Sequence, residues 1–359
     1  VIHTPGHTPE HISFLVTDRG AGVSEPIGIV SGDFLFVGDL GRPDLLETAA
    51  GKKGAADSEA HVLYKSIQKI KKLPEFLQVW PAHGAGSACG KTLGAVPSST
   101  IGYEMRFNQA LLAATNETNF VNHILAGQPE PPLYFARMKD ENRVGPQILG
   151  ELPKPQRLTS DQLKDLNTKE DVIIDTRPWK EFSKMHISGS FFHPINRSFI
   201  TDIGSMVGDD PNIFLVCRAN EVSTLVTSLV RIGLDKILGW IDPTDLNAFA
   251  DSGGSVTSTK ELRPSEVRED INSNSVHILD VRRSSEYQEG HISGSQHFVH
   301  TRLAANLDKI PTDKPILVHC RSGVRSSYAC SLLERRGLKY INMIGGMLEW
   351  ERSGLPVER

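Results

Sequence analysis

One cysteine of the chain stands where nucleophilic chemistry is favoured. Cys320 follows the apolar run Pro315–His319, and a short loop, residues 321–326, leads from it into a helical pattern. A tight loop between a strand and a helix directs backbone N–H groups and the positive end of the helix dipole at whatever lies inside it. We expect this loop to favour the thiolate of Cys320, which is the form of cysteine that attacks sulfur and can hold it as a persulfide.

The loop residues supply charge and flexibility. Arg321 and Arg325 add positive charge, and Ser322 and Gly323 are expected to contact the substrate, with the glycine permitting the tight backbone. Cysteine phosphatases use a similar loop but need five residues between cysteine and arginine, whereas four separate Cys320 from Arg325. The smaller loop suits sulfur better than phosphate. The alternative is an inert, buried cysteine at a strand end, and the interpretation as a nucleophile requires a sulfur that substrate can reach.

An internal repeat gives the organisation of the second half. The pattern Asp-x-Arg-x-x-x-Glu-aromatic occurs at Asp175 and again 105 residues later at Asp280, and Cys217 matches Cys320 at an offset of 103. Strand-like runs alternate with helical stretches in each copy, which predicts two α/β domains with parallel sheets. We place them at residues 158–252 and 258–359.

The other cysteines of the repeat are expected to be less reactive. The loop after Cys217 lacks the glycine and the second arginine and contains Glu221, whose negative charge would oppose a thiolate. We therefore expect the first copy to be inactive and to serve as a scaffold or docking surface. Cys330 lies in an apolar helical stretch and is predicted to belong to the core.

The sequence of the last domain closely resembles the rhodanese family. The resemblance rests on Cys320–Ser326, on Asp280–Arg282 and on Gly290–Ser295, and it covers roughly residues 258–359. It implies that Cys320 carries sulfane sulfur in an active sulfurtransferase domain.

Histidine and aspartate residues in the N-terminal part suggest a metal site. His7 lies in a loop rich in proline and glycine, Asp33 follows an apolar strand, and His83 ends another strand. Imidazole and carboxylate groups that meet at strand ends suit a transition metal with an open position. The candidate residues for such a site are His7, Asp33 and His83.

Three motifs in this order, H-T-P-G-H-T, S-G-D and P-A-H-G, resemble the metallo-β-lactamase superfamily over residues 1–150. Gly41-Arg42-Pro43-Asp44 resembles its persulfide dioxygenase branch, which implies an αββα fold and one non-haem Fe(II) held by two histidines and one aspartate. The resemblance implies that His7 and Asp33 are two of these ligands, and that His83 belongs to a second metal position or lines the pocket. The motif H-x-H-x-D-H is absent, so we expect the remaining ligand upstream of Val1, in a longer protein. The alternatives are a degenerate domain without metal, or a zinc-dependent thioester hydrolase of the glyoxalase type.

Two further residues are candidates near this metal. Arg42 could bind a substrate carboxylate, because a planar guanidinium suits carboxylates, or it could pair with Asp44. Cys89 lies in a glycine-rich loop shortly after His83 with Lys91 beside it, a setting that suits a reactive thiol able to take or position persulfide sulfur.

Composition limits the function classes. Net charge is -4, so no basic field is available to hold nucleic acid or an anionic membrane. No apolar run is long enough for a membrane span, and four cysteines without a CxxC pair predict a reducing, cytoplasmic setting.

The whole chain resembles a persulfide dioxygenase fused to a sulfurtransferase. Its expected partners are small persulfides, sulfite and thiosulfate, with a role in sulfide metabolism and thiosulfate formation. A non-catalytic sulfur carrier or docking protein is the alternative from another class, and a homo-oligomer is left open.

Overall fold

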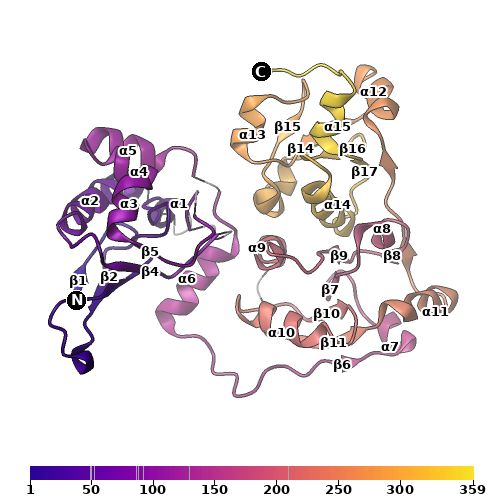
Figure 1. Ribbon diagram of the computed structural model, residues 1–359. Coiled ribbons are helices and arrows are strands. Elements are labelled where there is room, and N and C mark those ends of the chain that lie inside the picture. The colour runs from indigo at the N-terminus through magenta and orange to yellow at the C-terminus, as the bar shows by residue number, and fades with distance from the viewer. Residues whose placement is uncertain are drawn as a thin grey trace. The chain divides into compact units, whose positions relative to one another are not determined.

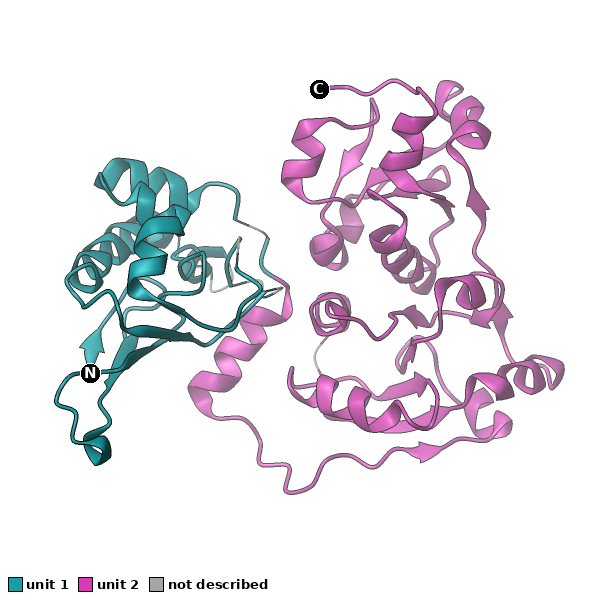
Figure 2. Cartoon of the chain, in the orientation of Figure 1, with its two compact units in different colours: residues 1–131 teal, residues 132–359 magenta. Residues whose placement is uncertain are grey.

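The computed structural model describes residues 1–48, 51, 53–85, 87, 89–91, 93–128, 130–208 and 210–359. Contacts divide the chain into two compact units, Val1–Pro131 and Pro132–Arg359 (Figure 2). The predicted boundary near residue 150 differs from this division, because helix α6 (Tyr134–Val144) belongs to the second unit. Arg137 of α6 donates a hydrogen bond to the backbone oxygen of Ile232 at 2.7 Å, which anchors the helix there.

The first unit is a five-stranded sheet with helices packed against it (Figure 1). The sheet order is β1 (Ile2–His3), β2 (Ile12–Val16), β3 (Gly28–Gly32), β4 (Gln78–Pro81) and β5 (Ser99–Thr100), and only β3 and β4 run parallel. The helices are α1 (Leu45–Thr48), α2 (Ala55–Ile70), α3 (Ile101–Phe107), α4 (Gln109–Ala113) and α5 (Glu117–Leu125), with a 3₁₀ turn at Arg19–Ala21. Helix α2 buries Leu63, Ile67 and Ile70, whose spacing of four and three residues places them on one face.

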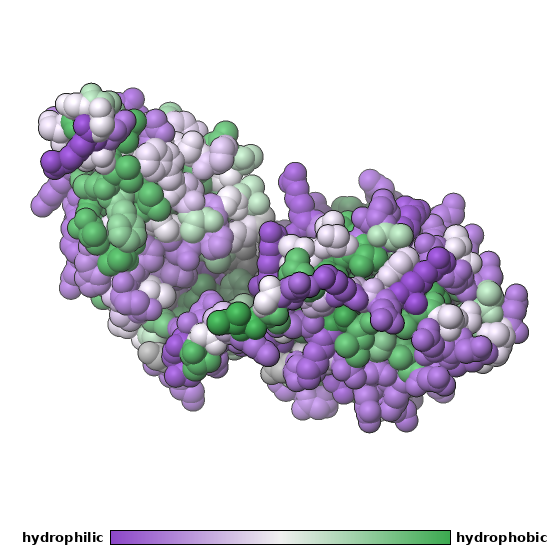
Figure 3. All heavy atoms as spheres, turned by 90° about the horizontal axis from the view of Figure 1, so that it is seen from below, coloured by the Kyte–Doolittle hydropathy of each residue, from purple (hydrophilic) through white to green (hydrophobic). Residues whose placement is uncertain are grey.

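The strands of this unit also carry exposed apolar residues. Apolar side chains gather on the surface of the first unit in the view of Figure 3. On β2 and β3 the exposed large apolar residues are Ile12, Phe14, Val16 and Val30. Residues of β2 alternate between exposed and more buried positions, so the helices cover one face of the sheet, as in one half of the predicted αββα arrangement.

The second unit begins with α6 and the first copy of the repeat. Its strands are β6 (Gln156–Arg157), β7 (Val172–Asp175), β9 (Phe191–Phe192), β10 (Ile213–Val216) and β11 (Ile237–Ile241). They form a parallel sheet in the order β6-β11-β10-β7-β9. Its helices are α7 (Ser160–Lys164), α8 (Trp179–Phe182), α9 (Phe199–Gly204), α10 (Val222–Val230) and α11 (Leu246–Asp251), with a 3₁₀ turn at Pro243–Asp245. A small antiparallel pair, β8 (His186–Ile187) with β12 (Val256–Thr257), leads to the next copy.

The second copy repeats this topology. Its strands are β13 (Glu261–Leu262), β14 (His277–Asp280), β15 (Gln296–His297), β16 (Ile316–His319) and β17 (Tyr340–Met343). The order β13-β17-β16-β14-β15 is that of the first copy, strand for strand, and every pair is parallel. Its helices are α12 (Pro264–Asn272), α13 (Ser284–Glu289), α14 (Val324–Arg335) and α15 (Gly346–Arg352), with a 3₁₀ segment at His300–Lys309. The two α/β domains predicted from the repeat are confirmed.

The two copies share one hydrophobic core. Apolar residues of β7 and β10 from the first copy and of β16 and α14 from the second belong to the same buried cluster, and this cluster includes both Cys217 and Cys320. The sheet of each copy therefore directs its cysteine toward the face on which the copies meet. Among the helices of the described residues, none is long and apolar enough to cross a membrane.

Candidate active site

Cys320 lies directly after β16, at the carboxyl end of the parallel sheet. The backbone N–H of Gly323 donates to its Sγ at 3.1 Å, and α14 begins at the next residue, Val324. Gly323 has φ +106°, in the left-handed region that favours glycine, so the loop needs this residue to turn its N–H inward. The predicted sequence of strand, tight loop and helix is thus present around the sulfur.

Backbone N–H groups at the start of α15 (Gly346–Arg352) hold the backbone of the Cys320 loop. Met347 N–H donates to the oxygen of Cys320 at 2.8 Å, and Leu348 N–H donates to that of Arg321 at 2.9 Å. Gly346 must be glycine here, because a Cβ at this position would lie 2.3 Å from the Cys320 oxygen. The start of α15 therefore fixes the backbone on which the thiol is mounted.

The Cys320 thiol is buried, whereas a nucleophile that substrate reaches directly would be exposed. Cys320 is 1% exposed, whereas Arg321 and Ser322 of the same loop are exposed. A sulfur held in this way is shielded from bulk water.

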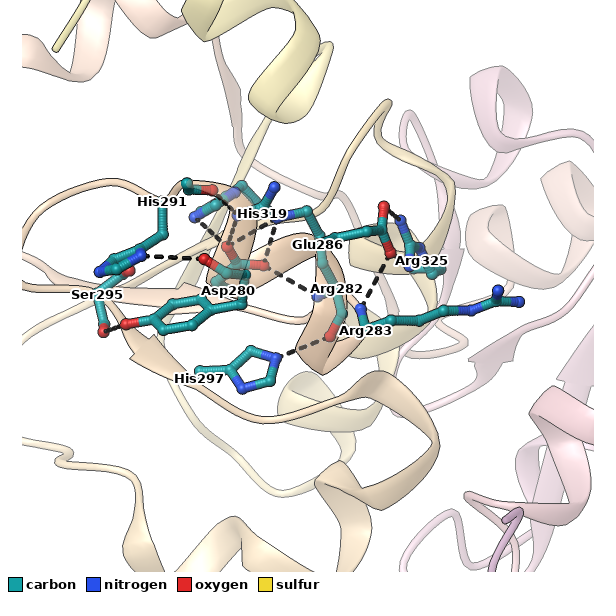
Figure 4. Close-up of polar contacts among 11 residues, drawn as sticks. Asp280, Arg282, Arg283, Glu286, His291, Ser295, His297, His319 and Arg325 are labelled. Atoms are coloured by element: carbon teal, nitrogen blue, oxygen red, sulfur yellow. Dashed lines mark hydrogen bonds and ion pairs between the residues drawn. The ribbon is translucent and has the colours of Figure 1, made fainter. Parts of the chain in front are cut away.

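Arg325 has a partner that the sequence pattern did not reveal. Its guanidinium donates from Nη1 to Oε2 of Glu286 at 2.5 Å and from Nη2 to Oε1 at 2.8 Å (Figure 4). Burial raises the pKa of Glu286, but the hydrogen bonds and charge of Arg325 outweigh it and lower the pKa to about 2. The Glu286 carboxylate balances part of the positive charge that Arg325 was expected to direct at the thiolate, although Arg325 still lies near enough for its charge to interact with that of Cys320. The predicted role of Arg325 beside the thiolate stays a prediction. The Glu of the repeated motif was visible in the sequence, but its partner was not.

The Asp-x-Arg pattern of the second copy forms a buried ion pair that also binds the backbone of a neighbouring loop. Asp280 accepts two side-chain hydrogen bonds from Nε of Arg282 and one from Nη2, and Nη2 also donates to the Gly290 oxygen at 2.7 Å (Figure 4). His319 lies beside this pair with Nε2 3.7 Å from Asp280 Oδ2, and its fully buried ring makes no hydrogen bond in the structure. Burial lowers the pKa of His319, the residue before Cys320, by more than the charge of Asp280 raises it. Sequence reasoning had assigned it no role.

The first copy presents a different environment to its cysteine. Cys217 is fully buried, and burial followed by the charge of Glu221 raises the pKa of its thiol to about 12. Glu221 also accepts the loop N–H of Arg218 at 2.8 Å, where an anion would otherwise bind. The predicted opposition between Glu221 and a thiolate is confirmed. Cys330 is buried in α14 as predicted, and burial raises its pKa well above the usual value.

Buried polar contacts join the two copies close to α14. Asn196 donates to the hydroxyl of Tyr328 at 3.0 Å, and His300 Nε2 lies 2.9 Å from Asp202 Oδ1. His193 stacks near Tyr328, with ring centroids 4.7 Å apart. The first copy therefore helps to hold the helix whose N-terminus faces Cys320.

The three residues predicted for a metal site lie together in the first unit. His7 Nε2 is 3.7 Å and His83 Nε2 is 3.0 Å from the carboxylate of Asp33. His7 Nδ1–H donates to the Arg42 backbone oxygen at 3.0 Å, and Nε2 on the other side of the ring lies toward Asp33. A backbone oxygen that orients the ring in this way is common for a metal-binding histidine. The His7 imidazole and the Asp33 carboxylate are of the chemical types that bind a transition metal ion. Within the described residues, however, no group of three or more such side chains has the geometry to hold a metal.

The structure places the other two candidates of this unit differently. Arg42 is 1% exposed and its guanidinium binds Asp44 at 2.9 and 2.6 Å, so the ion pair replaces the predicted substrate contact. Cys89 lies close enough to His83 to act on its pKa. The hydrogen bond that His83 donates to the Asp33 carboxylate and, after it, the one between His83 and Cys89 raise the pKa of this histidine to about 10. Lys91 does not supply charge to the thiol as expected, since its Nζ donates to the backbone oxygens of His123 and Ala126 at the end of α5.

Comparisons with known proteins agree with this division. The family model described as a rhodanese-like domain matches residues 159–242 and 263–353. A putative sulfurtransferase, YtwF of Bacillus subtilis, is 32% identical over 98 residues, which are 27% of this chain and 95% of the relative. Thiosulfate sulfurtransferase GlpE of Actinobacillus pleuropneumoniae is 29% identical over 27% of this chain and 92% of its own.

A solved structure covers more of the chain. The crystal structure of a metallo-β-lactamase from Staphylococcus aureus is 41% identical with a TM-score of 0.59, over 67% of this chain. The match covers 66% of that protein, so this chain spans about two thirds of its length. The chain therefore belongs to the rhodanese-like family, and its two rhodanese-like domains follow a region with the metallo-β-lactamase fold.

Proposed function

We propose that this protein is a sulfurtransferase that carries sulfane sulfur on Cys320, joined to a persulfide dioxygenase. The observation that supports the transferase most directly is the N–H of Gly323 on the Cys320 sulfur at 3.1 Å, at the start of α14. Such a donor and the positive end of a helix stabilise negative charge on sulfur. The relatives named as sulfurtransferases support the same assignment.

The transfer proceeds in two displacements. The Cys320 thiolate attacks the outer sulfur of a thiol persulfide, the S–S bond breaks, and the thiol leaves with the electron pair and a proton from solvent. Sulfite then attacks the outer sulfur of the Cys320 persulfide. The products are thiosulfate and the free Cys320 thiolate. Burial of Cys320 keeps water away from the persulfide between the two steps.

The first unit would supply the sulfite. His7 and Asp33 would hold an iron(II) ion together with a ligand from outside the described residues, and His83 and Cys89 would line the pocket. When bound, iron would supply O₂ activation, and one persulfide, one O₂ and one water would give a thiol, sulfite and two protons. Cys89, beside His83, would bind or position the persulfide. In this proposal the protein acts in sulfide detoxification in the cytoplasm.

Two measurements test these assignments separately. Metal analysis of the purified protein should find one iron per chain, and oxygen uptake should follow addition of glutathione persulfide and fall when Asp33 is replaced by Ala. Two zincs and thioester hydrolysis would favour a glyoxalase-type hydrolase instead, which the contact of His83 with Asp33 also allows. No metal and no oxygen uptake would leave a sulfur carrier.

The transferase is tested through Cys320. Cys320→Ser should abolish thiosulfate formation from persulfide and sulfite while oxygen uptake continues, because the two reactions use different sites. Cys330→Ser in the same domain serves as the matched control and should retain transfer. Thiosulfate formation that survives Cys320→Ser would contradict the proposal.

A further inference from the structure

The two arginines of the Cys320 loop are in different electrostatic situations. Arg321 is exposed, whereas the guanidinium of Arg325 forms a bidentate pair with the Glu286 carboxylate, with side-chain exposures of 20% and 16%. Glu286 is itself fixed, because its Oε2 also accepts the backbone N–H of Arg283 at 3.1 Å at the start of α13 (Figure 4). The ion pair is therefore a defined feature of the fold.

The pairing of Arg325 with Glu286 lowers the net positive charge that the Cys320 loop presents to a sulfur donor. The planar guanidinium of Arg325 uses both of its Nη atoms on Glu286, and those are the donors that would bind a sulfonate or sulfite group. With this pair neutral, the uncompensated positive charge of the loop is that of Arg321, together with the partial charge of the Gly323 N–H and the helix end.

Sulfur donors differ in the charge that must be stabilised. The reacting group of a thiol persulfide carries one negative charge at neutral pH, and the group that it releases is a thiol. Thiosulfate carries two, and the sulfite that leaves it also carries two, so its reaction gains most from a free guanidinium at the loop. A site whose second arginine is neutralised therefore favours the less charged donor.

We propose that Glu286 is a positioning residue that keeps Arg325 occupied, so that Cys320 accepts sulfur from thiol persulfides, whose reacting group carries one negative charge, in preference to thiosulfate, which carries two. This inference rests on the proposed transferase function of Cys320. In each case the Cys320 thiolate attacks the sulfane sulfur and the S–S bond breaks. The leaving group is a thiol for persulfide, with a proton from solvent, and sulfite for thiosulfate.

The repeat provides an internal control. Glu181 is the counterpart of Glu286 in the first copy, and Val222 stands there in the position of Arg325. A valine cannot pair with a carboxylate, so neutralising Glu181 changes one charge of the protein without releasing an arginine beside a cysteine. Glu181→Gln and Glu286→Gln therefore make the same change in side chain and charge, but only Glu286→Gln releases an arginine next to a loop cysteine.

The test is steady-state sulfur transfer to cyanide by the intact protein, with thiosulfate or glutathione persulfide as donor. Glu286→Gln should raise kcat/KM for thiosulfate about tenfold, mainly through KM, because a charge-assisted bidentate contact contributes on that order. Persulfide should change less than about threefold. Glu286→Asp should restore the wild-type donor ratio, and Glu181→Gln should not alter it.

A double variant covers the case in which Glu286→Gln does not fold. Glu286→Gln with Arg325→Met replaces a neutral ion pair by two neutral side chains, which proteins often tolerate. The donor ratio should then equal that of the wild type, whereas a direct role of Arg325 in holding thiosulfate would lower it. An unchanged ratio in folded Glu286→Gln, or a lowered ratio in the double variant, would overturn the inference. Absence of transfer from both donors in the wild-type protein would instead overturn the transferase assignment.

Discussion

The two loop cysteines should differ in reactivity although both are buried. Cys217 is 0% and Cys320 1% exposed, so a difference in rate reports the chemistry of the loops rather than access. Burial and then Glu221 raise the pKa of Cys217 from 9.0 to about 12, while the Cys320 sulfur receives an N–H. A shift of that size leaves about 10³-fold less thiolate near neutral pH. A more basic thiolate is intrinsically about 20-fold more nucleophilic, which leaves a net slowing of about 50-fold.

The assay is reaction of the native protein with a neutral disulfide reagent, 4,4′-dithiodipyridine, at pH 7.5, followed by peptide mapping at each time point. Cys217 should react at least about 50-fold more slowly than an unstructured cysteine peptide, with a rate that still rises tenfold per pH unit up to pH 10. Glu221→Gln should accelerate it only about three- to tenfold, because burial is the larger cause and remains. A Cys217 rate within threefold of that of Cys320 would refute this account of the first copy.

Three further outcomes follow from the buried groups. Burial lowers the pKa of His193 to about 4, so the unfolded chain takes up a proton between pH 6.5 and 4 that the folded protein does not, and the free energy of unfolding should fall as pH falls through that window. His193→Phe, the residue at the equivalent position 298, should weaken this dependence in urea titrations at pH 7 and pH 4.5. Arg42→Met should destabilise the first unit by about 3 kcal/mol, because it leaves Asp44 without its guanidinium partner, as thermal unfolding would reveal; an unchanged melting temperature would count against the pair. Cys330→Ala should cost about 1–2 kcal/mol as a small core cavity and leave sulfur-transfer kcat unchanged, whereas a loss of transfer in the folded variant would give Cys330 a role that the structure does not.

The fold of the second half could be predicted from the sequence because local patterns repeat. Each strand of the first copy has its counterpart about one hundred residues later, and the sheets have the same order. The position of Cys320 between a strand and a helix followed from neighbouring residues alone, as did the core position of Cys330. Strand and helix periodicity is a property of contiguous sequence, so it can be interpreted before packing is known.

Charge pairing and access were decided only by the tertiary structure. Arg325 and Glu286 are 39 residues apart, and nothing in their separate motifs indicates that the guanidinium would pair with that carboxylate. The same holds for the burial of Cys320 and for Arg42, whose two possible partners were equally compatible with its motif. Electrostatic interactions depend on distance and on exclusion of water, and both are set when elements distant in sequence pack together.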